Sequence, residues 1–480
     1  MKTTTKSNFY IDRRPLITLF LIEYKNAILL LFAFIVFFTF ISNPNIPEDM
    51  SIQAYQALII FLLANFLWIT NVIPLAITSL MVMGLLATFN VLPNEQIYSF
   101  FGNKALFFII GAFIISAGIS TSGLNKRIAY YFLSRFGDQP HRLTLSIFLL
   151  SGFLAHVMPA HAVAAMLFPI LMSISKKLEL DSNSILGKYM FFALAWGSVL
   201  GGVVTFLGGA RNPLAIGILE EATGETIGFL EWMIAVAPPI YLIMMMVSIY
   251  LIKQVSASTR DTEILKDFFS ETGERMSKIQ LKEIKALIIL VGTIYMWIFQ
   301  SKRFEIANIA LISAALFFVL NVIDWEDAKK EINWGAIFMY GGAIALGKAL
   351  EETGLLEYIN QNYISTMNFS TLGFILVVFS ISVFLTEGVS NAAVVVILLP
   401  VVIKTTTALG LPATLAVYLV AVPSGLAFMF PMSSPPNAIA FSSGYIKSSD
   451  TLKIGFALNI LSIAVVTVFA LTYWRIIGVY

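Results

Sequence analysis

The stretch ISVFLTEGVSNAAVVVILLP covers residues 381–400 and places a short polar segment between two apolar runs. Each apolar run within 371–405 is roughly 15 residues long, whereas a helix needs about 20 residues to cross the bilayer hydrocarbon. A helical hairpin that dips part-way into the membrane satisfies its backbone better than two incomplete spans. The sequence therefore predicts a re-entrant hairpin over 370–407, with its tip at 387–391.

A second copy of this pattern lies earlier in the chain. An apolar pair at 143–175 is interrupted at 158–161, which predicts another re-entrant hairpin over 142–176. Internal repeats in membrane proteins are typical of secondary transporters. The markers that recur 231 positions further on are Gly111, Gly123, Leu124 and Pro169, which match Gly342, Gly354, Leu355 and Pro400.

The composition defines the class of protein. The chain has 480 residues, of which 58% are hydrophobic and only 12% charged, so a soluble globule would expose large apolar areas. We predict an all-α polytopic membrane protein with about eleven transmembrane helices plus the two re-entrant hairpins. The absence of Cys excludes disulfides and thiolate metal sites, and the net charge of +2 gives no reason to expect a nucleic acid partner.

The distribution of Lys and Arg predicts the orientation. These residues crowd the N-terminal arm, 126–142, 176–188 and 253–285, but are absent from 44–53. By the positive-inside rule the N-terminus is cytoplasmic and the two copies are inverted, although Lys302 and Arg303 fall on the wrong side. The first apolar run lacks a small-residue cleavage site, so we predict a retained first span. We expect a bacterial plasma membrane, because the sequence shows neither a transit-like N-terminus nor extra domains.

Five segments follow from this pattern. We assign N-terminal scaffold helices to 1–100, the first repeat to 101–252, a cytoplasmic linker to 253–285, scaffold helices to 286–330 and the second repeat to 331–480. The mixed charges of the linker favour a solvated amphipathic connection, with a regulatory docking segment as the alternative.

The polar residues at the tip of the second hairpin are candidates for ligand binding. A helix that begins near Asn391 directs its free N–H groups and positive dipole end at the break, which favours an anion. Ser390 and Asn391 add neutral donors for a carboxylate. The alternative is that both residues only cap the helix.

Two further breaks interrupt apolar spans. Near the C-terminus, residues 432–438 contain Ser434, Pro436 and Asn437, and we expect the two prolines there to stop the helix. The counterpart at 208–213 contains Asn212, which lies 225 positions before Asn437. Broken helices in equivalent positions of two repeats indicate a binding site.

With these hairpin tips and broken helices, the sequence resembles the divalent anion/sodium symporters. That family carries a Ser-Asn-Thr motif at the tips of both re-entrant hairpins and Thr-Pro-Pro-Asn-like breaks in two unwound helices. The resemblance covers nearly the whole chain and implies a homodimer, in which each protomer has a scaffold and an elevator-like transport domain. It also implies C4 dicarboxylates, 2-oxoglutarate, citrate or sulfate as substrates.

The chain departs from the family pattern at its first hairpin. Pro159, Ala160 and His161 replace the Ser-Asn-Thr motif, and Ala155 stands at the position that matches Thr386. Because sodium needs several hard oxygen donors, a first sodium site built from these side chains is not expected. In the second hairpin Thr386 and Asn391 keep oxygen donors, so the sequence allows one residual sodium site there, although Ala392 replaces the motif's Thr. We predict no other cofactor.

Arg211 stands where the family pattern has Pro. An ionisable residue within a span is costly and is a functional candidate by default. We hypothesise that Arg211, with His161, replaces the charge of a sodium ion and neutralises a dicarboxylate through its bidentate fork. The alternatives are an ion pair between Arg211 and Glu387, and a neutral His161 bonded to backbone.

These residues predict the mode of transport. A fixed cation would make the return of an empty site slow, so we expect obligatory exchange of C4/C5 dicarboxylates such as malate, succinate, fumarate and 2-oxoglutarate, without sodium coupling. The alternative is a sodium-coupled symporter of di/tricarboxylates or sulfate.

Other classes of function fit the sequence less well. The three His residues form no metal-ligand array, and no nucleophile constellation indicates an enzyme. Zinc at His156 and His161 is not expected either. Inverted repeats with broken helices favour alternating access over a channel.

Overall fold

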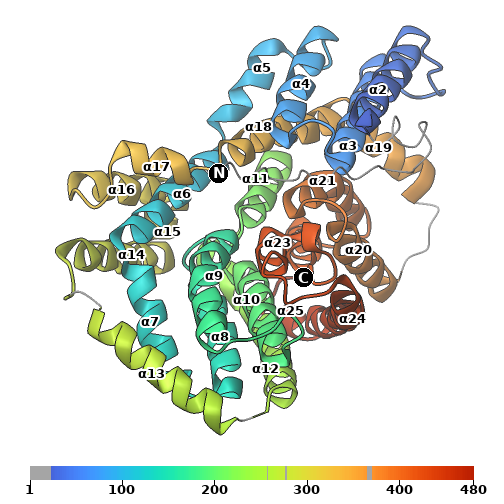
Figure 1. The fold of residues 1–480 in the computed structure, drawn as a ribbon. Coiled ribbons are helices and arrows are strands. Elements are labelled where there is room, and N and C mark those ends of the chain that lie inside the picture. Colours follow the sequence, from blue (N-terminus) through green and yellow to red (C-terminus); the bar gives the residue numbers. More distant parts are fainter. Residues whose placement is uncertain (1–22, 257, 276–277, 365–369) are drawn as a thin grey trace, which may run out of the picture.

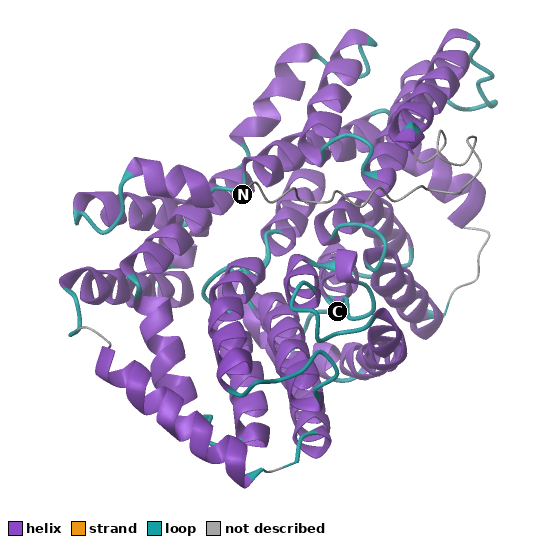
Figure 2. Ribbon diagram, viewed as in Figure 1, coloured by secondary structure: helices purple, strands orange, loops and turns teal. Residues whose placement is uncertain are grey.

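The structure is a computed structural model that describes residues 23–480 except 257, 276–277 and 365–369. Its described residues form helices and no strand (Figure 2). Within this part of the chain, seven helices are long and apolar enough to cross a membrane, and four shorter apolar helices accompany them. The all-α, multi-pass prediction is confirmed, whereas the count of eleven spans and the orientation stay predictions. The basic N-terminal arm lies outside the described residues.

The internal repeat is visible in the bounds of the helices. Six helices of the first half recur in the second half, and each first residue agrees with a shift of 231 positions to within one residue. The correspondence begins before residue 101, where we predicted the first repeat to start. The first set is α4 (Leu75–Thr88), α5 (Asn94–Ser99), α6 (Lys104–Ser122), α7 (Leu124–Phe136), α8 (Pro140–Leu154) and α9 (Ala160–Lys177). The second set is α16 (Ile306–Val319), α17 (Trp325–Glu331), α18 (Trp334–Glu352), α19 (Leu355–Ile359), α20 (Thr371–Thr386) and α21 (Asn391–Ala408).

The two repeats pack against each other through equivalent contacts. Helix α6 packs on α16, where a Cβ at Gly111 would stand 2.8 Å from Ala310. Helix α18 packs on α4, where a Cβ at Gly342 would stand 2.5 Å from Ser79. Since Ser79 and Ala310 are also 231 positions apart, the two contacts are related by a pseudo-two-fold operation, as in an isologous interface.

The remaining helices complete the molecule. Figure 1 shows α8–α12 and α20–α25 through its centre and lower right, with α2–α5 above and α14–α17 to the left. Helix α10 is almost fully buried among them. The bounds not given above are α2 (Lys25–Ser42), α3 (Ile52–Thr70), α10 (Ile185–Val204), α11 (Arg211–Thr223), α12 (Phe229–Gln254), α13 (Thr259–Arg275), α14 (Leu281–Phe299), α15 (Ser301–Phe304), α22 (Ala413–Ala421), α23 (Pro435–Phe441), α24 (Ser448–Leu471) and α25 (Tyr473–Ile476), with single 3-10 turns at Phe100–Gly102, Pro423–Gly425 and Pro431–Ser433 and a π turn at Asn360–Ile364.

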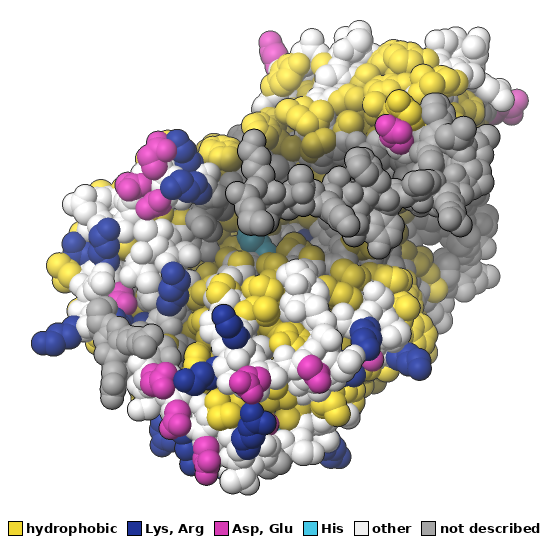
Figure 3. Space-filling view, viewed as in Figure 1, with side chains coloured by type: hydrophobic (Ala, Val, Ile, Leu, Met, Phe, Trp, Pro, Cys, Tyr) yellow, Lys and Arg dark blue, Asp and Glu magenta, His cyan; other side chains and the backbone are white. Residues whose placement is uncertain are grey.

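The predicted linker contains α13, an amphipathic helix. Its buried face includes Leu265 and Phe269 and packs against α7 and α9. Its charged face forms exposed ion pairs, such as Lys177–Glu271 at 3.3 Å. Figure 3 shows charged side chains gathered in the lower half and at the left of the molecule, and broad apolar surface over α2–α5. Broad apolar surface of this kind suits a chain that faces lipid.

Candidate functional site

Both predicted breaks are present, but they lie further upstream than expected. Helix α10 ends at Val204 and α11 begins at Arg211, while α22 ends at Ala421 and α23 begins at Pro435. We expected the two prolines at 435–436 to stop the preceding helix, and this was wrong. They lie instead in the first turn of the following helix, α23. First-turn N–H groups have no partner within the helix, so Pro is tolerated there at no cost in hydrogen bonds.

Asn212 and Asn437 hold the two unwound segments in the same way. The Nδ2 of Asn212 donates to the carbonyl oxygens of Thr205 at 2.7 Å and Gly202 at 3.4 Å. The Nδ2 of Asn437 donates to those of Ala427 at 3.0 Å and Phe430 at 3.4 Å. In each case the asparagine and its two acceptor residues lie 225 positions apart from their counterparts in the other repeat. The predicted equivalence of the two breaks is thus also an equivalence of contacts.

The tip of each hairpin contacts the break of its own repeat. The α8–α9 hairpin turns at 155–159, where the N–H of Ala160 donates to the carbonyl oxygen of Gly208 at 3.1 Å. The hydroxyl of Thr205 donates to the carbonyl oxygen of His156 at 2.6 Å. The α20–α21 hairpin turns at 387–390 and contacts the turn Pro423–Gly425. The paired hairpins predicted from sequence therefore exist as helix–turn–helix units, and their position in a bilayer stays a prediction.

Oxygen atoms converge at the second tip. The hydroxyl oxygen of Thr386 lies 2.8 Å from Oδ1 of Asn391 and 2.8 Å from the carbonyl oxygen of Ser424. One hydroxyl proton serves only one of these acceptors at a time, so the cluster has spare acceptor capacity. Hard oxygen donors of this kind are the ligands that alkali and alkaline-earth cations prefer. Ser390 caps α21 by accepting from the N–H of Ala393 at 3.3 Å.

Arg211 is buried between the two breaks. Its guanidinium is bracketed by two glycines, since a Cβ at Gly209 would stand 2.4 Å from Nη1 and a Cβ at Gly425 would stand 2.1 Å from Nη2. Nη2 donates to the carbonyl oxygen of Gly202 at 3.3 Å, whereas Nε has no partner among the described residues. A guanidinium carries five N–H donors, so most of its capacity is unused. Only glycine at positions 209 and 425 leaves room for this guanidinium.

Glu387 does not pair with Arg211, which overturns that alternative. The Oε1 of Glu387 accepts from the N–H of Phe428 at 2.8 Å, and both carboxylate oxygens accept from the N–H of Met429 at 3.0 and 3.1 Å. Oε2 also accepts from the N–H of Phe430 at 3.1 Å. The carboxylate sits in a nest of three backbone N–H donors on the unwound segment.

The other predicted residues lie nearby with fewer contacts. His161 is half-buried in the first turn of α9 and forms no hydrogen bond within the described residues, so the backbone bond that we gave as the alternative is not observed. Ser434 is buried and its hydroxyl has no partner in the same part of the chain. Pro436 is buried in the first turn of α23.

Sequence reasoning missed Tyr340. This α18 side chain is buried, lies within electrostatic range of Arg211 and has a hydroxyl without a partner among the described residues. No sequence signal distinguishes it, because its proximity to Arg211 depends on how α18 packs against α11.

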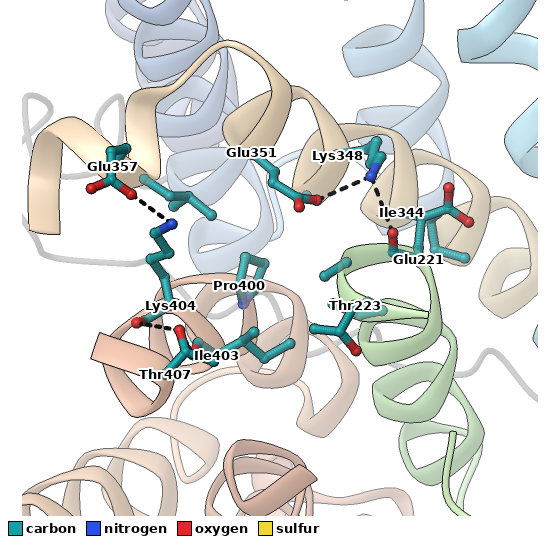
Figure 4. Close-up of a pocket in the computed structure, with 14 residues that line it drawn as sticks. Glu221, Thr223, Ile344, Lys348, Glu351, Glu357, Pro400, Ile403, Lys404 and Thr407 are labelled. Atoms are coloured by element: carbon teal, nitrogen blue, oxygen red, sulfur yellow. Dashed lines mark hydrogen bonds and ion pairs between the residues drawn. The ribbon is translucent and has the colours of Figure 1, made fainter. Parts of the chain in front are cut away.

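A cavity of about 250 Å³ lies beside the C-terminal part of α11 and is bounded by α18, α19 and α21 (Figure 4). The ammonium of Lys348 lies 3.1 Å from the carbonyl oxygen of Glu221, and that of Lys404 lies 2.6 Å from the carboxylate of Glu357. The hydrogen bond from Lys404 holds the pKa of Glu357 below its ordinary value. Charged contacts of this kind join α11 and α21 to α18 and α19.

The sequence also matches a known family of membrane transporters. Residues 25–480 match the family described as the sodium:sulfate symporter transmembrane region. The chain belongs to this family. The resemblance to divalent anion/sodium symporters is therefore confirmed, and an enzymatic role is excluded because the family consists of transporters.

Similar proteins are transporters as well. The chain is 29% identical over 449 residues to the sodium-dependent dicarboxylate transporter SdcS of Staphylococcus saprophyticus, covering 88% of this chain and 86% of that protein. It is 27% identical, with the same coverage, to the protein of that name from a Staphylococcus aureus strain.

Two solved structures share the fold. The YdaH transporter of Alcanivorax borkumensis aligns with a TM-score of 0.54 at 14% identity, over 80% of this chain and 88% of that one. MtrF of Neisseria gonorrhoeae aligns with a TM-score of 0.55 at 13% identity, over 78% and 82%. At this level of identity the likeness concerns the fold alone.

Proposed function

We propose that this family member carries C4/C5 dicarboxylates across a bacterial plasma membrane by alternating access. The observation that carries the proposal is the buried guanidinium of Arg211, held between two broken helices with most of its donors unused. A planar fork of this kind suits a carboxylate. The sodium-dependent dicarboxylate transporters among its relatives support the same substrate class.

The substrate site comprises Arg211 and the ends of the broken helices. One carboxylate binds Arg211, and the start of α21 with Ser390 and Asn391 offers N–H and amide donors to the other. The proposal keeps the other residues that the sequence pattern nominated for the site, which are His161, Asn212, Ser434, Pro436 and Asn437. Movement of the two hairpins and broken helices as one elevator domain against a dimeric scaffold belongs to the same proposal.

Sodium coupling is the mode of transport that the observations favour. The oxygens of Thr386, Asn391 and Ser424 already converge at one point, and the named relatives depend on sodium. A single sodium ion bound there, with Arg211 in place of a second cation, would offset both negative charges of a dicarboxylate. Sodium is then a co-substrate.

Exchange without sodium is the second candidate. The first hairpin supports it, because Ala155, Pro159 and Ala160 offer no side-chain oxygen at the positions that match Thr386, Ser390 and Asn391.

Reconstitution distinguishes these modes. Purified protein is placed in liposomes that contain succinate or are left empty, and labelled succinate uptake is followed with and without an inward sodium gradient. Sodium-driven uptake into empty vesicles is expected for the symporter, and sodium-independent uptake that requires internal succinate for the exchanger. Arg211→Ala should abolish succinate binding by folded protein, and unchanged affinity would contradict the proposed site.

A further inference from the structure

Buried charges are few in the part of the chain that the structure describes. Among the described residues, three charged side chains are buried: Arg211, Glu283 and Glu387. Glu283 forms an ion pair with Arg127 at 2.9 Å. Arg211 and Glu387 form no ion pair within the described part of the chain, so each charge is held without a direct partner of opposite sign.

Arg211 and Glu387 nevertheless belong to one packed unit. The guanidinium contacts Gly425, and the carboxylate binds the N–H of Phe428, three residues further on. Three residues of extended chain span at most about 11 Å. Helix α11 also packs against α21 and α22, so a displacement of one charge as part of a rigid body displaces the other.

The surroundings of Glu387 fit an ionised carboxylate. Four donor groups surround it: the N–H groups of residues 428–430 and the Nδ2 of Asn459, at 2.8 Å from Oε1. A carboxylate accepts hydrogen bonds at both oxygens, whereas a neutral acid or amide presents a donor that would oppose an N–H. The nest also keeps the carboxylate from reaching Arg211, whose donors stay free for a ligand.

We propose that Glu387 is the fixed counter-charge of Arg211 in the unit that carries the substrate. This inference rests on the proposed function, since it matters only if that unit moves across the membrane. A unit with one uncompensated charge meets a steep barrier in low dielectric, whereas a pair of opposite charges that move together lowers this barrier.

The counter-charge changes the expected coupling. From sequence we expected the empty site to carry the charge of Arg211 and to return slowly. With Glu387 in the same unit, the empty site is close to neutral and returns readily. A bound dianion then leaves the loaded unit negative, and co-bound cations such as sodium are needed for it to cross. Glu387 thereby favours net, cation-coupled transport over obligatory exchange.

A comparison of exchange and net efflux tests this inference. Proteoliposomes loaded with labelled succinate are diluted into one of two media. Medium with succinate measures exchange, in which the site is loaded in both directions. Medium without succinate measures net efflux, in which the empty site must return. Glu387→Gln is expected to slow efflux at least tenfold more than exchange. Asn459→Ala is the matched control, because it disturbs the same nest without removing a charge, and it should slow both modes in parallel.

The outcomes separate the two levels of the proposal. If Glu387→Gln also slows efflux and exchange in parallel, Glu387 has only a structural role and the counter-charge is wrong. If the unmodified protein moves no succinate in either mode, the proposed function fails, and the inference fails with it.

A second measurement needs no variant. In the unmodified protein, efflux into succinate-free medium is followed at several potassium diffusion potentials, with internal succinate saturating so that the return of the empty site limits the rate. A neutral empty unit predicts an efflux rate that does not change with potential. An unbalanced Arg211 predicts a change approaching about 50-fold per 100 mV, as for one elementary charge that crosses the membrane, and this result would overturn the inference.

Discussion

The guanidinium of Arg211 lies directly against Gly425, where a Cβ atom would stand only 2.1 Å from Nη2. Arg211 comes from the first repeat and Gly425 from the second, so this contact joins the two broken helices. The proposed substrate site is thus assembled from both halves of the chain, and its shape depends on the absence of a side chain at residue 425.

Gly425→Ala should displace the guanidinium while leaving its charge in place. Misplacing a charged hydrogen-bond donor costs about 1.5 kcal/mol or more, so we expect succinate affinity to fall by about tenfold or more. Calorimetric titration of the purified variant measures this loss. Gly388→Ala is the control, because a Cβ there meets no atom within 4 Å. Equal affinities of the folded Gly425 variant and the parent protein would contradict the bracketed site.

Thr386→Val tests the oxygen cluster. The substitution keeps the shape of the side chain but removes the hydroxyl that lies 2.8 Å from Asn391 and Ser424. We expect the sodium concentration for half-maximal succinate uptake to rise about tenfold, since one hard oxygen ligand is lost. Thr406→Val provides a matched control, because that buried hydroxyl only donates within α21 to the carbonyl oxygen of Val402. Unaltered sodium dependence of the Thr386 variant would place the cation elsewhere.

Much of the fold could be predicted from the sequence, because the duplicated part of the chain shows its hairpins and its breaks twice. The 231-position shift located both hairpins, and the 225-position shift located Asn212 and Asn437, since each repeat needs the same caps at the same breaks. The role of Glu387 could not be predicted in this way. Opposite charges suggested a pair with Arg211, but the carboxylate binds N–H groups that an unwound backbone exposes. Residue types alone do not show in which direction those N–H groups point.

The two asparagine caps should stabilise the fold. Asn212→Ala and Asn437→Ala each leave carbonyl oxygens of an unwound segment buried and unpaired, which costs about 1–3 kcal/mol for a lost partner. We expect both variants to melt at lower temperature in detergent solution, by similar amounts because their contacts are equivalent. Asn94→Ala, at an exposed position, should not change the melting temperature. A loss confined to one asparagine would show that the two breaks are not energetically equivalent.

The ion pair between Lys404 and Glu357 predicts a pH dependence. The hydrogen bond from Lys404 holds the pKa of Glu357 below its ordinary value of 4.5, so the folded protein favours the charged carboxylate more than the unfolded chain does. The stabilisation is therefore fully present above pH 4.5 and is lost as the pH falls through the lowered pKa. We expect Glu357→Gln to melt slightly below the parent protein at pH 7 and to match it at the acidic end. Both side chains are partly exposed, so solvent screening keeps the difference small.

Glu225→Gln, at an exposed site, should follow the parent protein at every pH. A difference for Glu357→Gln that persists unchanged in acid would show that the carboxylate charge is not its source, and would assign the contact between α21 and α19 to packing alone.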